Sequence, residues 1–87
     1  MLIGIRRSGI SKSGGSFGAS AIETVWLKGS AVPGVDARRF RKDGCGAWME
    51  RDKYGDTTPT GMGWEIDHIL PVSQGGTDDI WNLQPLQ

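Results

Sequence analysis

Two adjacent residues, Asp67 and His68, have side chains that could take part in chemistry, and His68 is the only histidine in the 87-residue chain. A carboxylate beside an imidazole occurs in metal sites and in catalytic sites. A single histidine is more often a structural residue, so both interpretations stay open from these two residues alone. The pair lies where a predicted strand meets a loop, and loops carry functional residues disproportionately. Asn82 follows after a connection over residues 69–81.

The position of the pair in a strand limits how it could act. Adjacent strand residues point to opposite faces, so Asp67 and His68 can serve one site only if the strand ends or kinks between them. Pro71 follows three residues after His68 and is consistent with an early end. Glu65 shares a face with Asp67 and could add a second carboxylate, although it could equally be a solvated residue.

Short elements are predicted around these residues. Residues 64–67 alternate apolar and acidic side chains, which is strand periodicity. Residues 83–86 are predicted to form the returning strand, which Pro85 confines to an edge. Between them, residues 74–76 form a tight turn, and Thr77 or Asp78 could cap a helical turn through residue 81. Asp78 and Asp79 are therefore interpreted as capping or solvated residues.

The preceding part of the chain predicts one helix and a thin core. Ser20 and Glu23 fit a capping box that begins a helix over residues 21–28, although part of this stretch would suit a strand. Residues 36–42 are predicted to form one or two helical turns, and residues 46–50 a strand. Residues 1–20 are rich in Gly and Ser and are predicted to be a flexible arm before a folded domain over residues 21–87. Four tryptophans are expected to form the core: Trp26, Trp48, Trp64 and Trp81.

Charge is balanced overall and divided along the chain. Ten basic residues cancel ten acidic ones, but the part up to Lys42 has a net charge of +6 and the rest has −6. This asymmetry predicts one surface that attracts phosphates and another that is rich in carboxylates, against the alternative of an inert dipolar surface. The candidate phosphate-binding residues are Arg38, Arg39, Arg41 and Lys42.

The single cysteine, Cys45, excludes an intramolecular disulfide and a zinc finger built on several cysteines. Cys45 is expected to be a small buried residue. No apolar run approaches the ~18 residues of a membrane span, and no signal-peptide segment follows the first residues. A cytoplasmic protein without a membrane partner is therefore expected.

The motifs of the second half resemble the HNH endonucleases. They are WEIDHI (64–69), Pro71, GGTD (75–78) and NLQPL (82–86). The stretch from Glu23, with ETVWLKG, PG, RRFRKDGCGAWM and KYG, is similar to a group of small bacterial and phage-associated HNH proteins. The resemblance covers residues 23–87, roughly three quarters of the chain.

This resemblance implies an α+β domain of the ββα-metal type, also called the His-Me finger. It implies that Asp67 is a metal ligand, that His68 is the general base that activates water, and that Asn82 is an orienting residue that fixes the loop and the base. Imidazole, with an ordinary pKa of ~6.5, suits the activation of water near neutral pH. A divalent metal is implied, with Mg expected and Mn, Zn or Ni open, and no small-molecule cofactor. DNA is the implied partner, and the oligomeric state stays open.

The sequence also departs from the family pattern. In the family, a helix supplies the last metal ligand eight or nine residues beyond the middle Asn, whereas five residues follow Asn82 here. The sequence therefore predicts an incomplete site without the C-terminal helix, which holds metal weakly. Such a chain would be a fragment, a prematurely ended frame or a degenerate member.

Four functions remain open from the sequence. The first is a metal-dependent nuclease that hydrolyses DNA, and the second is an inactive HNH remnant that only binds nucleic acid. The third is a calcium-binding module, suggested by residues 75–79, although such modules need several stacked repeats and the chain has one copy. The fourth is a structural domain without a chemical role.

Overall fold

A computed structural model describes residues 10–12 and 15–87 of the chain. Much of the predicted arm over residues 1–20, including Arg6 and Arg7, lies outside the described residues, so the predicted division into an arm and a domain stays a prediction. Among the residues described, none of the helices has the length and apolar character needed to cross a membrane.

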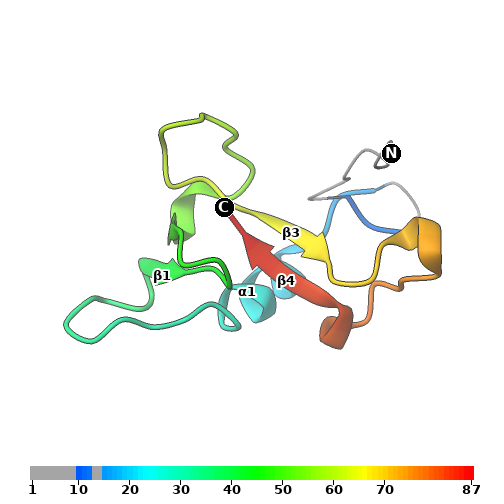
Figure 1. The fold of residues 1–87 in the computed structure, drawn as a ribbon, viewed down its shortest axis with the longest axis horizontal. Helices are drawn as coiled ribbons and strands as arrows, with labels where there is room; N and C mark the ends of the chain where they lie inside the picture. Colours follow the sequence, from blue (N-terminus) through cyan, green and yellow to red (C-terminus); the bar gives the residue numbers. More distant parts are fainter. Residues whose placement is uncertain (1–9, 13–14) are drawn as a thin grey trace.

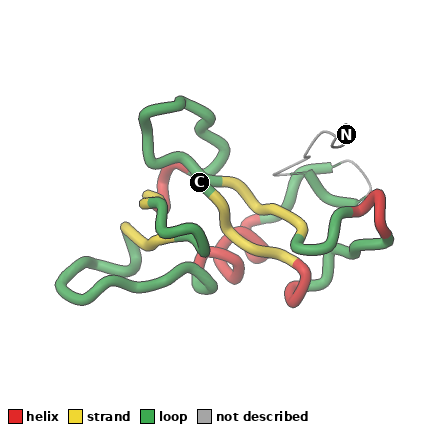
Figure 2. The backbone as a smooth tube through the Cα atoms, in the orientation of Figure 1, coloured by secondary structure: helices red, strands yellow, loops and turns green. Residues whose placement is uncertain are grey.

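The described chain contains one α-helix and two small antiparallel sheets (Figures 1 and 2). This arrangement confirms the α+β class predicted from the sequence. The first sheet pairs β1 with β2, and the second pairs β3 with β4. Single turns of 3-10 helix lie between the strands. The elements in chain order are α1 (Ala19–Trp26), β1 (Phe40–Lys42), β2 (Trp48–Glu50), η1 (Arg51–Lys53), β3 (Glu65–His68), η2 (Val72–Gln74), η3 (Ile80–Asn82) and β4 (Leu83–Leu86).

The β3–β4 hairpin holds the residues that the sequence singled out. Its register runs from Glu65 opposite Leu86 to His68 opposite Leu83. Both strands were predicted, β4 with the same bounds and β3 shifted by one residue. Pro85 is tolerated because the sheet has two strands, so β4 has an outer edge that needs no N–H donor. A long loop, residues 69–82, joins the two strands.

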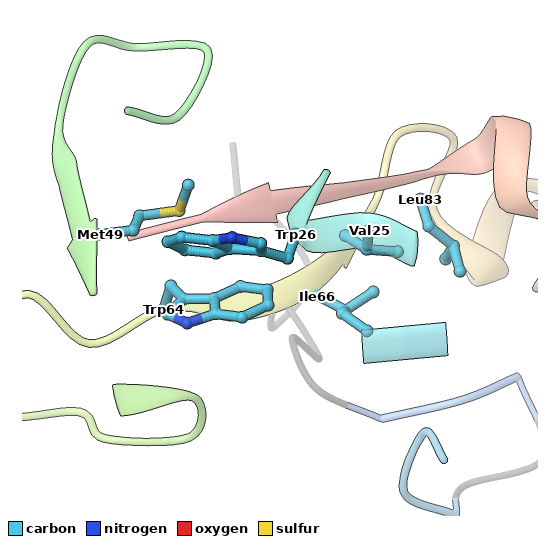
Figure 3. Close-up of a cluster of buried hydrophobic side chains, with 6 residues drawn as sticks. All are labelled: Val25, Trp26, Met49, Trp64, Ile66 and Leu83. Carbon is cyan, nitrogen blue, oxygen red and sulfur yellow. The ribbon is translucent and has the colours of Figure 1, made fainter. Parts of the chain in front are cut away.

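The core lies between α1 and the β3–β4 hairpin (Figure 3). The Trp26 and Trp64 rings lie 5.2 Å apart between centroids, and Tyr54 meets Trp64 edge to face. Complete burial of an apolar side chain stabilises the fold by about 1.5–3 kcal/mol, so this small cluster carries much of the stability. The buried members are Val25, Trp26, Met49, Trp64, Ile66 and Leu83.

The prediction of a core built on four tryptophans is correct for two of them. Trp26 and Trp64 are buried, Trp48 is half-buried, and Trp81 is 66% exposed. Trp81 follows Ile80 in the 3-10 turn η3, and Ile80 is also exposed. The third residue of this turn, Asn82, is buried, whereas its two apolar residues are exposed. Asn82 faces inward because its amide makes three hydrogen bonds to the loop backbone.

The predicted capping box is wrong. Helix α1 begins at residue 19 after Gly18, and no side chain caps its first turn. Ser20 lies inside the helix, where its carbonyl accepts a hydrogen bond from the Thr24 hydroxyl. Glu23 does not reach back to Ser20, because its carboxylate pairs with Arg51 at 2.9 Å.

Residues 36–42 form a turn followed by a strand, so the predicted helical turns are wrong beyond residue 39. Pairing of β1 with β2 overrides the local preference, with Arg41 opposite Met49. The buried Asp43 carboxylate closes this hairpin by accepting the N–H groups of Cys45 and Ala47 at 2.9 Å each. Cys45 is exposed in the turn, which overturns the expectation that it is buried.

Candidate active site

His68 is the last residue of β3, and its side chain is 7% exposed. Its Nε2 atom lies 2.7 Å from the Oδ1 atom of Asp78. The Phe17 ring packs near the imidazole, with centroids 5.9 Å apart. The only imidazole of the chain is therefore buried and held by a carboxylate ten residues further on.

Asp78 was interpreted from the sequence as a capping or solvated residue, and its side chain is indeed 38% exposed, but it also contacts His68. Besides the contact with His68, both of its carboxylate oxygens accept the backbone N–H of Lys12, at 2.8 and 2.9 Å. This contact places Lys12 beside the loop that follows β3 (Figure 1). Asp79 is the residue that precedes η3, and its side chain caps nothing there.

The Gly75-Gly76 pair is the sequence signal that could have indicated this contact. Gly75 adopts a positive φ of 91°, which favours glycine. A Cβ atom on Gly76 would lie 1.8 Å from the Leu70 carbonyl oxygen, so the loop can close only with glycine there. The two glycines therefore turn the chain back and deliver Asp78 to His68.

Asn82 is completely buried and fixes the same loop. Its Oδ1 atom accepts the Leu70 N–H at 2.8 Å. Its Nδ2 group donates to the carbonyl oxygens of Leu70 at 3.1 Å and Thr77 at 2.8 Å. One amide thus holds both sides of the loop, and its hydrogen bonds go to the loop backbone and not to the imidazole.

Asp67 is buried, with 3% of its surface exposed, and accepts a hydrogen bond from Gln84 Nε2 at 3.3 Å. Strand β3 continues through His68, which pairs with Leu83, so the strand does not end between Asp67 and His68. Because adjacent residues of a regular strand point to opposite faces, one site for both side chains requires a kink at His68, the last residue of β3.

The donor set available for a metal is small. Residues 10–12 and 15–87 contain no group of three or more His, Cys, Asp or Glu side chains placed to hold an ion. Asp67 provides one carboxylate, and Glu65 is half-buried two residues before it. Magnesium is commonly held by one or two carboxylates, with water and substrate phosphate completing its shell. Asp67 fits that mode of binding and not a cage built entirely from protein ligands.

The predicted phosphate-binding cluster is divided by the structure. Arg41 donates from Nε to the Ala37 carbonyl at 2.9 Å and from Nη1 to the Gly29 carbonyl at 2.8 Å, so its guanidinium braces the backbone. Arg38 is exposed and pairs with Asp36. The hydrogen bond that its side chain donates lowers the pKa of the Asp36 carboxyl from its ordinary value.

Arg39 and Lys42 stack their cations over aromatic rings. The Arg39 guanidinium lies 5.1 Å from the Phe40 ring centroid, and the Lys42 ammonium lies 4.9 Å from that of Trp48. A cation over a ring face keeps its charge, so both side chains remain cationic groups near the surface.

Comparison with known proteins relates part of the chain to one family. The family model HNH endonuclease matches residues 49–86, which include β3, the long loop and β4. No curated protein and no solved structure matches the chain in these comparisons. HNH domains are nuclease domains, and as a family they generally use a divalent metal and act on DNA. Residues 49–86 therefore match the HNH endonuclease family, which confirms the resemblance predicted from the motifs.

Proposed function

We propose that the chain is a metal-dependent endonuclease that hydrolyses phosphodiester bonds of DNA, with His68 as the general base. The observation that carries this proposal is the buried Asn82 clamp, which ties Leu70 to Thr77 and closes the loop between the two strands of the matched segment. A loop fixed in this way holds a base in place through the reaction. In this proposal, β3 and β4 are the two strands of a ββα-metal unit.

The chemistry assigned to each residue follows from its type. A water molecule would lose a proton to the His68 imidazole and attack phosphorus, and the bond from phosphorus to the leaving oxygen would break. Asp67 would hold the divalent metal, which supplies positive charge against the charge that develops on the phosphate and leaving oxygen. Asn82 would act through the loop, as an orienting residue does.

DNA binding would use the exposed cations near the first sheet. Arg38, Arg39 and Lys42 can meet phosphates, because none of the three is committed to the backbone in the way that Arg41 is. Phosphate contacts position a protein on DNA and carry no sequence information of their own. The proposed enzyme would therefore hold DNA by its backbone.

The test is a plasmid-nicking assay with Mg or Mn on the native chain and on His68→Ala. The rate should fall by ~10²–10⁴-fold in the variant, because a positioned base contributes about that much. DNA affinity should stay within about twofold, since the imidazole makes no phosphate contact in this scheme. Gln74→Ala, in an exposed part of the same loop, is the control and should cleave normally. Unchanged cleavage by His68→Ala would remove the imidazole from the mechanism.

A second function, nucleic-acid binding without cleavage, is favoured by the small donor set around Asp67. One carboxylate is a weak anchor for a metal. Salt-dependent DNA binding by the native chain, together with no His68-dependent nicking at millimolar Mg or Mn, would establish this alternative over the enzyme.

A further inference from the structure

We propose that Asp78 is the positioning residue for His68, holding the imidazole in the form that presents a basic Nδ1 atom to water. This inference rests on the proposed function, because it assigns the residue that orients the proposed base. It goes beyond the roles implied for Asp67, His68 and Asn82, because it assigns a role to a further residue, Asp78.

The hydrogen bond between the two residues fixes the tautomer. An ionised carboxylate can only accept, so the ring nitrogen that lies 2.7 Å from Asp78 Oδ1 must carry the hydrogen. That nitrogen is Nε2. In a neutral imidazole the other nitrogen then has the free electron pair, so Nδ1 is the atom that can take a proton. The ring is also restrained, because its side chain is 7% exposed and packs near Phe17.

Asp78 is itself held in place from three directions. The Lys12 N–H reaches both carboxylate oxygens. The Asn82 amide holds the carbonyl of Thr77, the preceding residue, at 2.8 Å. The close approach of Gly76 to the Leu70 carbonyl fixes the turn just before it. A carboxylate restrained in this way can orient an imidazole without reorganising during a reaction.

The step that this arrangement supports is balanced in protons and bonds. Water gives one proton to His68 Nδ1, the resulting hydroxide forms a bond to phosphorus, and the bond to the leaving oxygen breaks with its electron pair. The imidazole is then a cation with a hydrogen on each nitrogen, and the Asp78 carboxylate beside Nε2 stabilises that cation. Asp78 stays ionised throughout and takes no proton.

The first measurement requires no activity. Because His68 is the only histidine, a chain labelled with ¹⁵N-histidine gives a single pair of imidazole signals. In alkaline buffer, the native chain should show a protonated Nε2 with a downfield, slowly exchanging hydrogen, and an unprotonated Nδ1. Asp78→Ala should lose the downfield hydrogen through exchange with water, whereas Asp79→Ala, a change of the neighbouring aspartate, should keep it. A proton on Nδ1 in the native chain, or an unchanged Nε2 hydrogen in Asp78→Ala, would overturn the proposal.

The second measurement concerns cleavage. Asp78→Ala should lower kcat by roughly 10²-fold with little change in KM, because orientation of the base matters in the transition state more than in DNA binding. In a His68→Ala background, the same change should alter the rate by less than about twofold, since Asp78 acts through the imidazole. An equal loss in both backgrounds would indicate general damage to the fold and would overturn the positioning role.

Asp78→Asn guards against a folding failure. It keeps an oxygen acceptor of the same shape for Lys12 but lacks the charge that stabilises the imidazole cation, so it should melt near the native temperature and still lower kcat. Native kcat in Asp78→Asn would contradict the proposal. If the native chain does not cleave DNA at all, the proposed function fails, and the histidine spectra alone decide whether Asp78 orients His68.

Discussion

At the residue scale, the site depends on buried polar side chains whose hydrogen-bonding groups have partners. The Asn82 amide uses its acceptor and both of its donor hydrogens on the loop backbone, so it is buried without cost from unpaired groups. Among the described residues, one buried side-chain atom breaks this rule, the Tyr54 hydroxyl, which has no hydrogen-bond partner. The ring of Tyr54 still packs edge to face on Trp64.

Replacement of Tyr54 by Phe should therefore be neutral or should raise the free energy of unfolding by about 1 kcal/mol. The change removes a hydroxyl that loses its hydration on folding and gains no hydrogen bond in return. It keeps the ring contact with Trp64. Thermal melting at neutral pH measures the effect. Tyr54→Leu is the matched control and should be destabilising, because it loses the aromatic contact. A clearly less stable Phe variant would show that the hydroxyl has a partner in solution.

The free energy of unfolding should depend on pH differently in the native chain and in Tyr54→Phe. Burial, together with the negative charge of Glu65, raises the pKa of the Tyr54 phenol above its ordinary value. The unfolded chain then loses this proton at lower pH than the folded chain does. The stability that Tyr54 contributes is present below about pH 10 and is lost as the pH rises through the folded pKa. The native chain should therefore lose stability above about pH 10 more steeply than Tyr54→Phe in urea titrations.

At the scale of elements, the loop over residues 69–82 is the part that shapes the site. It contains two single 3-10 turns and depends on the Asn82 clamp and on two glycines that differ in their role. Gly75 has a left-handed backbone with open space around it, whereas Gly76 is packed against the Leu70 carbonyl. These two positions allow backbone strain and steric overlap to be measured separately.

Gly75→Ala should cost about 1–2 kcal/mol, because a Cβ is disfavoured in the left-handed region. Gly76→Ala should cost more than that, since its Cβ would overlap a backbone oxygen at 1.8 Å and the loop would have to move. The movement should displace Asp78, so Gly76→Ala should also lose the downfield histidine hydrogen while Gly75→Ala keeps it. Urea unfolding and the histidine spectrum are the two measurements. Equal stability of the two variants would mean that the loop is looser than the close contact implies.

Local patterns predicted some elements and missed others for identifiable reasons. The strand predicted at residues 64–67 follows from alternation within a few residues, and the returning strand was predicted at residues 83–86, the bounds that β4 has. Strand β1 was missed because Phe40–Lys42 becomes a strand only through pairing with β2. The Asp78–His68 contact was missed because it depends on closure of a long loop, which no short window contains. The capping-box prediction was wrong because Glu23 pairs with Arg51, a residue far away in the sequence, and not with the start of its own helix.

At the scale of the whole molecule, the charge asymmetry of the sequence is only partly a binding surface. Arg41 is one of the basic residues in the positively charged part of the chain. Its guanidinium nevertheless donates to the Ala37 and Gly29 carbonyls and thereby joins the segment after α1 to β1. A count of basic residues cannot distinguish a cation that braces the fold from one that meets a ligand. The structure separates the two groups and predicts different consequences for each.

The triple variant Arg38→Ala, Arg39→Ala, Lys42→Ala should reduce the slope of log affinity for duplex DNA against log salt by up to ~2.7, from ~0.9 for each lost phosphate contact. Its melting temperature should change little, because these side chains are near the surface. Arg41→Ala should do the reverse, lowering the melting temperature while leaving the salt slope nearly unchanged. Fluorescence anisotropy over a salt series and thermal melting distinguish the two. An unchanged slope in the triple variant would show that DNA binds elsewhere.

The packing of α1 has a consequence for where the protein can be divided. The segment that recurs in the family starts at residue 49, but two of the six core side chains, Val25 and Trp26, come from the helix before it. Lys28, just beyond that helix, donates to the Ile80 and Leu83 carbonyls, and so ties it to the turn before β4. Removed from these residues, the β3–β4 hairpin would be a marginal two-stranded ribbon. A boundary drawn at residue 49 would therefore leave two core side chains behind and cut through the hydrophobic interior.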